Sequence, residues 1–508
     1  MNNIRTLWEH CRNDFKGLAA VRWLEKKDVK EISYTGLDEA VTAVRKGLAE
    51  AGLSGKHIAL IGTSSVFWIE SYLAITTGDN VAVPLDANLP AEDLVDLLNR
   101  SDSEALFLSP KLKALTETVK AECPKIKNIW FLSEEDDQPC LTQLRASGEG
   151  VDDVEGNGED ELATIIFTSG TTGKSKGVML TQNNLASNVA SVQYIVEPGC
   201  VLMSVLPIHH AFCLCMDWLK GFSLGAVICI NDSFLHMVRN MSIFKPEVML
   251  MVPLMIESIY KRLATADPSV PAQVLAQNVF GGNLRIIFTG GAHLDPFYIG
   301  KFREYGVDVL EGYGMSECSP VITSNTPDDH KDGSIGKPLP NVEIRFENDE
   351  ILVRGSSVMK GYYMMPEETA KTLEDGWLHT GDKGYIDEDG FLFINGRVKN
   401  LIILSNGENI SPEEIENKIS LSPLVAEVIV TGEDNGLTAR IYPEKELAEA
   451  RGMDAAEIRS SIQSFIDEYN VSQPTYRRIT ALVVRDNPFI RNATSKIIRA
   501  KALEDIPA

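Results

Sequence analysis

The chain has 508 residues, 44% of them apolar, and a formal net charge of −24 at neutral pH. A chain of this length exceeds one hydrophobic core, so two or more domains are predicted. The negative charge disfavours nucleic acid and anionic membranes as partners. The first residues lack the apolar core of a signal peptide, and the eight cysteines form no CxxC pair. Polar residues interrupt the most apolar region, 201–230. A cytoplasmic protein with reduced thiols and no transmembrane segment is therefore expected.

In the first 330 residues, segments with the apolar spacing of a helix alternate with segments that have the pattern of a strand. This alternation predicts an α/β fold. From residue 335 the spacing shortens and predicts a small antiparallel β unit, and the pattern breaks at 397–400. We therefore predict a large N-terminal domain, 1–398, of parallel and mixed sheets with helices, and a small α+β C-terminal domain, 399–508. The predicted helices are 38–51 and 66–77, and the predicted strands are 57–62, 81–85, 164–167, 178–180, 201–206, 226–230, 248–252, 285–289, 307–310, 342–346, 350–354 and 390–394.

The stretch 164–177, TIIFTSGTTGKSKG, is a predicted strand followed by ten residues with almost no apolar side chain. Its glycines allow backbone amides to approach an anion, and its hydroxyls and lysines add donors and charge, which suits a polyphosphate. It is not a Walker A loop, because Thr168 stands where that motif has glycine, and because 178–180 predicts a second strand with Thr181 capping the next helix. A strand–loop–strand phosphate clamp is one interpretation, and a flexible surface turn is the other.

Two other segments have alternative interpretations. His209, His210, Cys213 and Cys215 lie within seven residues, but no second ligand cluster follows, so structural cysteines are favoured over a zinc site. The segment 477–501 holds seven basic residues and one acid. It is either a solvated helix end or a lid that presents cations to a polyanion.

Further polar and glycine-containing motifs follow in the order EGYGMSE (311–317), WLHTGD (377–382), GRVK (396–399), SNGENI (405–410) and ATSKIIR (493–499). Each motif alone is weak. Together with the clamp, in this order and spacing, they resemble the adenylate-forming superfamily. That superfamily includes acyl-CoA synthetases, aryl-CoA ligases, peptide-synthetase adenylation domains and firefly luciferase, and the resemblance extends from about residue 30 to the end.

The resemblance implies a function for individual residues in ATP binding. Glu317, together with Thr168, is implied to hold Mg²⁺, and Lys496 to reach the carboxylate and the α-phosphate. Asp382 is implied to bind the ribose hydroxyls with support from Arg397. The residues implied to wrap the phosphates or flank the adenine are Thr168, Ser169, Gly170, Thr171, Thr172, Gly173, Lys174, Gly291, Ala292, Gly312, Tyr313 and Ser316.

The resemblance also implies a mobile C-terminal domain that rotates about Lys399, and a pantetheine tunnel beside Gly407. His210 and Phe212 are implied to border the carboxylic-acid pocket, with Lys496, Glu317 and His210 as the catalytic residues. One departure is Ser495, where the superfamily usually has glycine; its Cβ restricts the backbone there.

The implied activity is ATP-dependent activation of a carboxylic acid to an acyl-adenylate, followed by transfer to coenzyme A. Residues 248–260 are apolar and methionine-rich, which suits an alkyl tunnel as well as a plain core. A medium- or long-chain fatty acid is therefore expected as substrate. The alternatives are an aryl acid, an acyl-carrier protein or other thiol as acceptor, and an inactive acyl- or nucleotide-binding protein.

Overall fold

The structure, a computed structural model, describes residues 2–135, 139–168, 175–194, 196–264, 269–403, 409–433, 436–491 and 497–504. The chain divides into two compact units. Unit 1 comprises Met1–Ile344 with Val353–Leu378, and unit 2 comprises Arg345–Leu352 with His379–Ala508. The boundary therefore passes through three strands, β16 (Val342–Glu347), β17 (Glu350–Gly355) and β20 (Trp377–Ile386). The division into 1–398 and 399–508 stays a prediction.

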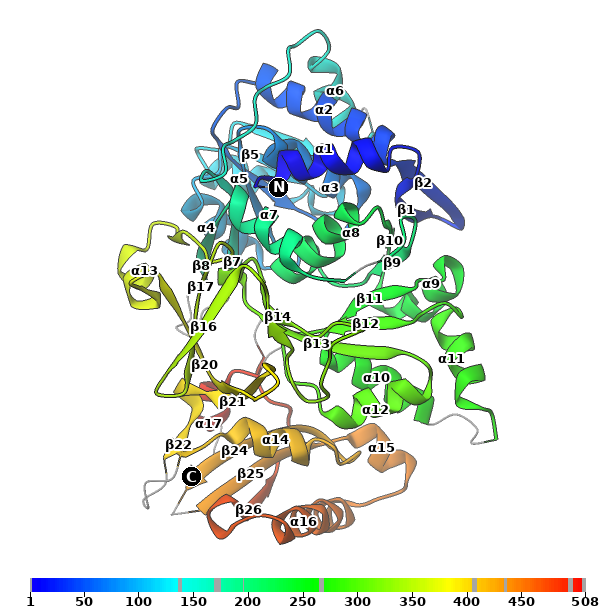
Figure 1. Cartoon of the computed structure of the whole chain (residues 1–508), viewed down its shortest axis with the longest axis vertical. Helices are drawn as coiled ribbons and strands as arrows, with labels where there is room; N and C mark the ends of the chain where they lie inside the picture. The colour runs from blue at the N-terminus through cyan, green and yellow to red at the C-terminus, as the bar shows by residue number, and fades with distance from the viewer. Residues whose placement is uncertain are drawn as a thin grey trace. The chain divides into compact units, whose positions relative to one another are not determined.

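Unit 1 contains a nine-stranded sheet whose centre is parallel (Figure 1). Strands β13, β12, β11, β9, β10 and β1 run parallel to one another, while β2, β14 and β15 pair antiparallel. In sheet order the strands are β15 (Lys337–Pro338), β14 (Val321–Ser324), β13 (Asp308–Gly314), β12 (Ile286–Thr289), β11 (Val248–Met251), β9 (Val201–Ser204), β10 (Val227–Ile230), β1 (Ala19–Glu25) and β2 (Asp28–Ser33).

A seven-stranded sheet in the same unit carries the predicted clamp. Its strands β7, β4, β3, β5 and β6 are parallel, and β8 and β18 extend it in antiparallel fashion. Its order is β18 (Gly361–Tyr362), β8 (Lys176–Thr181), β7 (Leu162–Thr168), β4 (Val81–Leu85), β3 (His57–Ile61), β5 (Ala105–Leu108) and β6 (Asn128–Phe131).

Thirteen α-helices accompany these sheets in the described part of unit 1. They are α1 (Ile4–Asp14), α2 (Tyr34–Glu50), α3 (Val66–Thr77), α4 (Ala91–Arg100), α5 (Leu115–Glu122), α6 (Leu141–Ser147), α7 (Gln182–Ser191), α8 (Lys220–Ser223), α9 (Met237–Phe244), α10 (Pro253–Ala264), α11 (Ala272–Phe280), α12 (Pro296–Glu304) and α13 (Pro366–Thr372). The predicted helix 66–77 is confirmed as α3, which begins where the Ser65 side chain accepts a hydrogen bond from the Trp68 amide. Eleven of its twelve residues are buried and Phe67 is partly buried, so the helix is packed on nearly all sides.

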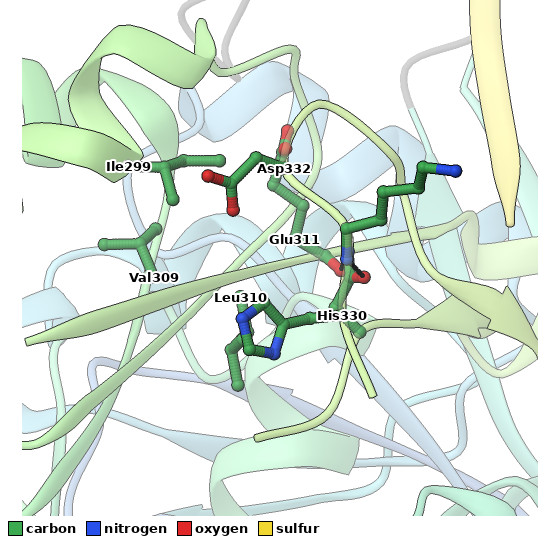
Figure 2. Close-up of a pocket in the computed structure, with 8 residues that line it drawn as sticks. Ile299, Val309, Leu310, Glu311, His330 and Asp332 are labelled. Atoms are coloured by element: carbon green, nitrogen blue, oxygen red, sulfur yellow. Dashed lines mark hydrogen bonds between the residues drawn. The ribbon is translucent and has the colours of Figure 1, made fainter. Parts of the chain in front are cut away.

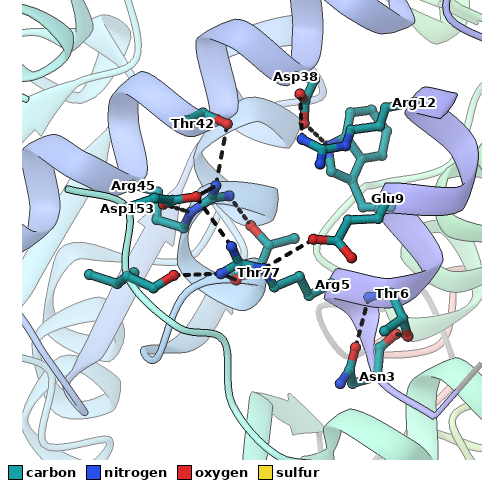
Figure 3. A network of polar contacts seen from close by, with 12 residues as sticks. Asn3, Arg5, Thr6, Glu9, Arg12, Asp38, Thr42, Arg45, Thr77 and Asp153 are labelled. Atoms are coloured by element: carbon teal, nitrogen blue, oxygen red, sulfur yellow. Dashed lines mark hydrogen bonds and ion pairs between the residues drawn. The ribbon is translucent and has the colours of Figure 1, made fainter.

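A polar network attaches the connector before β7 to the first helices (Figure 3). Arg45 of α2 donates to both Asp153 carboxylate oxygens, at 2.7 and 2.6 Å, and to the Thr77 hydroxyl at 2.8 Å. Arg5 of α1 donates to the Val154 carbonyl at 2.6 Å. Because the Arg45 guanidinium is buried, its charge requires these partners, and they fix the path of the chain into the clamp strand.

Unit 2 has its own α+β core, as predicted. Strand β25 (Gly436–Pro443) pairs antiparallel with β24 (Val425–Glu433) and parallel with β26 (Ile479–Val484). Ile415 and Ile419 of α14 pack with Ile462 and Ile466 of α16 in the hydrophobic core beside this sheet. The other elements are the pair β22 (Ile402–Ile403) and β23 (Asn409–Ile410), β21 (Leu392–Arg397), α14 (Pro412–Ile419), α15 (Lys445–Ala450), α16 (Ala455–Val471) and α17 (Arg499–Glu504).

In the described parts of the chain, no helix combines the length and apolarity that a bilayer crossing requires. All eight cysteines are buried free thiols.

Candidate active site

Strands β7 and β8 form the base of the predicted phosphate clamp. Thr168 at the end of β7 pairs with Lys176 at the start of β8, so the two predicted strands are confirmed as an antiparallel pair. Arg100, at the end of α4, supports this base, because it donates to the Ser175 carbonyl at 2.5 Å and lies 5.6 Å from the centre of the Phe167 ring. The clamp residues Ser169, Gly170, Thr171, Thr172, Gly173 and Lys174 lie outside the described residues.

Glu317, the predicted Mg²⁺ ligand, lies in a short 3₁₀ turn, Ser316–Cys318, after β13. Its side chain is 9% exposed, and its Oε1 accepts a hydrogen bond from the Tyr362 hydroxyl at 2.8 Å. Among the residues described, no lysine or arginine forms an ion pair with this carboxylate. A buried carboxylate with only a neutral partner favours a nearby cation, and oxygen donors are what Mg²⁺ prefers.

Three predicted binding segments meet at Gly290. A Cβ at Gly290 would lie 3.0 Å from the Gly312 carbonyl oxygen and 3.9 Å from the ring of Phe212. The loop that carries Gly291 and Ala292, the end of β13, and the segment with His210 and Phe212 are therefore in contact or nearly so. Gly290 leaves space there that a larger residue would fill.

The sheet topology explains why these segments meet. Strands β9, β11, β12 and β13 are parallel neighbours, so their carboxyl ends lie at one edge of the nine-stranded sheet. The segment 205–212 follows β9, the segment 290–295 follows β12, and Tyr313 lies at the end of β13. Ligands in open α/β sheets bind at this edge.

The two adjacent histidines differ in environment. The rings of His209 and His210 lie 4.2 Å apart between centres. Burial, reinforced by His210, lowers the pKa of His209 to about 4, so its imidazole is neutral at physiological pH. Its Nε2 lies 3.8 Å from an oxygen of Asp86 and makes no hydrogen bond within the described chain.

A buried polar group follows the predicted acid-pocket residues. The π-helical segment η2 (Cys213–Leu219) begins directly after Phe212 and includes Asp217, which has no exposed surface. Ser204 donates to Asp217 Oδ2 at 2.9 Å, and burial raises the pKa of Asp217 to about 7. Burial also lowers the pKa of Lys220 to about 8; its ammonium donates to the Val189 carbonyl at 3.1 Å.

Glu311 at the start of the EGYGMSE motif is also buried. It lines a small surface pocket with Ile299, His330 and Asp332 (Figure 2). Burial raises the pKa of Glu311 to about 8, so its side chain is mainly protonated at neutral pH. Its backbone carbonyl accepts hydrogen bonds from the amide and side chain of Asn325, both at 3.0 Å, which fixes this part of β13.

In unit 2 the structure brings Asp382 and Arg397 together. These residues are partners across the antiparallel β20–β21 pair, and Arg397 Nε lies 2.9 Å from Asp382 Oδ1. The preceding Gly381 adopts a φ of +72° and donates its amide to Glu350 at 2.9 Å. Asp382 is buried, and it follows within β20 a backbone conformation that few residues other than glycine adopt.

The remaining predicted site residues are placed only in part. Lys399 is exposed in a 3₁₀ turn, Val398–Asn400, of unit 2. Gly407 and Lys496 lie outside the described residues. Arg100 and Tyr362 were not predicted as site residues, because nothing local in the sequence shows that their partners, Ser175 and Glu317, are neighbours.

Comparisons with known proteins show the family of the chain. The sequence matches the AMP-binding enzyme family over residues 8–363 and the AMP-binding enzyme C-terminal domain over residues 399–506. A long-chain-fatty-acid–CoA ligase, FadD15 of Mycobacterium bovis, is 27% identical over 444 residues, covering 77% of this chain and 74% of the relative. A feruloyl-CoA synthase of an Amycolatopsis species is 29% identical over 423 residues, covering 79% and 80%.

Solved structures share the fold along nearly the whole chain. ATP-bound MatB of Rhodopseudomonas palustris superimposes with a TM-score of 0.80 at 27% identity and 98% coverage of both chains. The o-succinylbenzoate coenzyme A synthetase MenE of Bacillus subtilis, solved with ATP and a magnesium ion, gives a TM-score of 0.77 at 25% identity, covering 98% of this chain and 99% of MenE. The chain therefore belongs to the AMP-binding enzyme family, the adenylate-forming superfamily that its motifs resemble.

Proposed function

We propose that this protein is an ATP-dependent acid–CoA ligase whose acid is a medium- or long-chain fatty acid. In the first step a carboxylate oxygen attacks the α-phosphorus of ATP and pyrophosphate leaves. In the second step the CoA thiol loses its proton, attacks the acyl carbon, and AMP leaves. The observation that carries this proposal is the meeting of Phe212, Gly290 and Gly312 at the carboxyl edge of one parallel sheet.

This meeting point supports the predicted positions of nucleotide and acid. Gly291, Ala292 and Gly312 carry little or no side chain, which suits the approach of an adenine, and Tyr313 offers an aromatic ring. His210 and Phe212 follow β9 at the same edge and border the acid. In unit 2, Asp382 accepts hydrogen bonds from the ribose hydroxyls while Arg397 holds its carboxylate in place.

The first step brings two anions together, so it depends on cations and on positioning. Lys496 contributes a positive charge beside the carboxylate and the α-phosphate, and the clamp residues donate hydrogen bonds to the other phosphates. Glu317, with the Thr168 hydroxyl, fits Mg²⁺ because it is a buried carboxylate with a neutral partner. When bound, the ion supplies positive charge to the phosphates.

The second step requires different groups around the acyl carbon. Rotation of the C-terminal domain about Lys399 removes Lys496 and brings Gly407 beside the pantetheine. The basic stretch 477–501 is suited to the phosphates of CoA.

The relatives include ligases for alkyl acids and for aryl acids. The fatty-acid reading is supported by the long-chain ligase relative and by β11, whose residues Val248–Met251 are buried and apolar. The feruloyl-CoA synthase relative supports an aryl acid as second candidate.

A panel of acids separates these candidates. Purified protein with ATP, Mg²⁺ and CoA is offered saturated acids of four to eighteen carbons, benzoate and ferulate, and thioester formation is followed by mass spectrometry. We expect thioesters of the longer alkyl acids. Turnover of ferulate or benzoate alone would replace the fatty acid by an aryl acid, and acyl transfer to an acyl-carrier protein but not to CoA would replace the acceptor.

A further inference from the structure

Tyr362 forms a direct link to Glu317 across 45 residues of sequence. The Tyr362 hydroxyl donates to Glu317 Oε1 at 2.8 Å, and the two side chains are 5% and 9% exposed. In such a buried environment a hydrogen bond to a charged acceptor is stronger than at the surface. The hydroxyl fixes one carboxylate oxygen and leaves the other lone pairs of Glu317 for further partners.

The backbone of Tyr362 is held from two sides. Strand β18 pairs antiparallel with β8, with Tyr362 opposite Val178. On the other side, the Tyr362 amide donates to the Thr369 hydroxyl of α13 at 2.9 Å, and this hydroxyl in turn donates to the Met365 carbonyl at 2.9 Å. The phenol therefore approaches Glu317 from a fixed scaffold.

The ring of Tyr362 also contacts the base of the clamp. The Lys176 ammonium lies 4.8 Å from the ring centre, within the range of a cation–π contact, and donates to Glu368 at 2.7 Å. Lys176 is the residue that pairs with Thr168 at the end of the clamp strands. One tyrosine thus contacts both a residue of the clamp base and Glu317.

We propose that Tyr362 is a positioning residue that fixes the Glu317 carboxylate for the divalent cation of the ATP complex. The inference rests on the proposed function, in which Glu317 binds that cation. Tyr362 touches neither ATP nor the acid in this account; it acts through Glu317. Groups that orient a metal ligand from behind typically alter metal affinity or activity by about 10- to 100-fold when they are removed.

The test compares Tyr362→Phe with Tyr363→Phe. The second variant is a matched control, because Tyr363 also donates to a carboxylate, Asp102 Oδ2 at 2.8 Å, and packs against the His57 ring in the same unit. Both changes remove one hydroxyl and keep the aromatic ring. Thermal unfolding midpoints of the two variants show whether each fold is intact.

The first readout is binding of Mn²⁺ to the protein in the presence of ATP, followed by electron paramagnetic resonance without any acid. We expect Tyr362→Phe to weaken Mn²⁺ binding about 10-fold, Tyr363→Phe to leave it unchanged, and Glu317→Gln to weaken it at least as much as Tyr362→Phe. Equal Mn²⁺ binding in the Tyr362→Phe and Tyr363→Phe proteins overturns the inference, as does wild-type binding by Glu317→Gln.

The second readout is the Mg²⁺ concentration that half-saturates acid-dependent ATP–pyrophosphate exchange. Tyr362→Phe should raise this half-saturating Mg²⁺ concentration about 10-fold, and the exchange rate should be restored at high Mg²⁺. If Tyr362→Phe does not fold, Thr369→Val removes the partner of the Tyr362 amide and should shift both readouts in the same direction. Absence of exchange in the wild type contradicts the proposed function, whereas exchange with unchanged Mg²⁺ dependence in the variants contradicts the inference alone.

Discussion

Arg397 Nε lies 2.9 Å from Asp382 Oδ1, and the two residues are register partners in the β20–β21 pair. The arginine side chain is 53% exposed and the aspartate side chain 8% exposed. The ion pair with the exposed arginine orients the carboxylate of the buried aspartate. Because the guanidinium is more than half exposed, its charge is screened by solvent, and we expect this pair to matter mainly for ATP binding.

Removal of this pair should weaken ATP binding. Asp382→Ala is expected to weaken it at least 10-fold, because ribose hydroxyls lose a charged acceptor, and Arg397→Met by a smaller factor. The control is Arg345→Met, which removes an exposed arginine 3.6 Å from Glu347 in the same unit. Calorimetric titration with ATP measures the dissociation constant of each of the three variants. Equal ATP affinities in all three would refute the role of Asp382.

A methyl group at Gly290 should damage the site. The added Cβ would lie 3.0 Å from the Gly312 carbonyl oxygen, which must then move by a few tenths of an ångström, and in ordinary contact with Phe212 at 3.9 Å. We expect Gly290→Ala to reduce acid-dependent ATP–pyrophosphate exchange at least 10-fold. Gly300→Ala is the control, because no atom lies within 4 Å of its Cβ and the residue is inside α12. That change should leave exchange intact and stabilise the protein by up to about 1 kcal/mol.

Several elements of the fold were predictable from the sequence, because local signals specified them. Helix α3 and strand β4 match their predicted ranges, since Ser65 supplies the cap and buried apolar runs supply the rest. The Tyr362–Glu317 contact was not predictable, because it depends on how β18 adds to β8. The extent of unit 2 depends likewise on distant contacts, such as the hydrogen bond from the Thr380 hydroxyl to the Ile351 carbonyl at 2.7 Å.

The two half-reactions should respond differently to two lysines. Lys496→Ala is expected to abolish most adenylation while leaving thioester formation from supplied acyl-adenylate largely intact, because only the first step requires its charge. Lys399→Pro should preserve adenylation and impair thioester formation, since proline restricts the hinge. Single-turnover assays of each half-reaction distinguish these outcomes. If both variants lose both steps equally, a rotation between two conformations is contradicted.

Asp217 should make stability depend on pH. Its pKa is raised from 3.8 to about 7 by burial, so the folded protein retains a proton that the unfolded chain releases above about pH 4. This contribution to stability is present at low pH and is lost as the pH rises to about 7. Asp217→Asn lacks the titrating group and should gain stability relative to the wild type between pH 5 and 8, by up to about 3 kcal/mol. Unfolding midpoints of both proteins at pH 5 and pH 8 measure this gain in stability. A difference in stability between the two proteins that is independent of pH would argue against a buried, protonated carboxyl.

The protein is proposed to activate a carboxylic acid as its adenylate. The most direct measurement is incorporation of labelled pyrophosphate into ATP, with Mg²⁺ and without CoA, in the presence and absence of a fatty acid. The account predicts incorporation only when the acid is present. No incorporation with any alkyl or aryl acid, over the full range of Mg²⁺ concentrations, would contradict it.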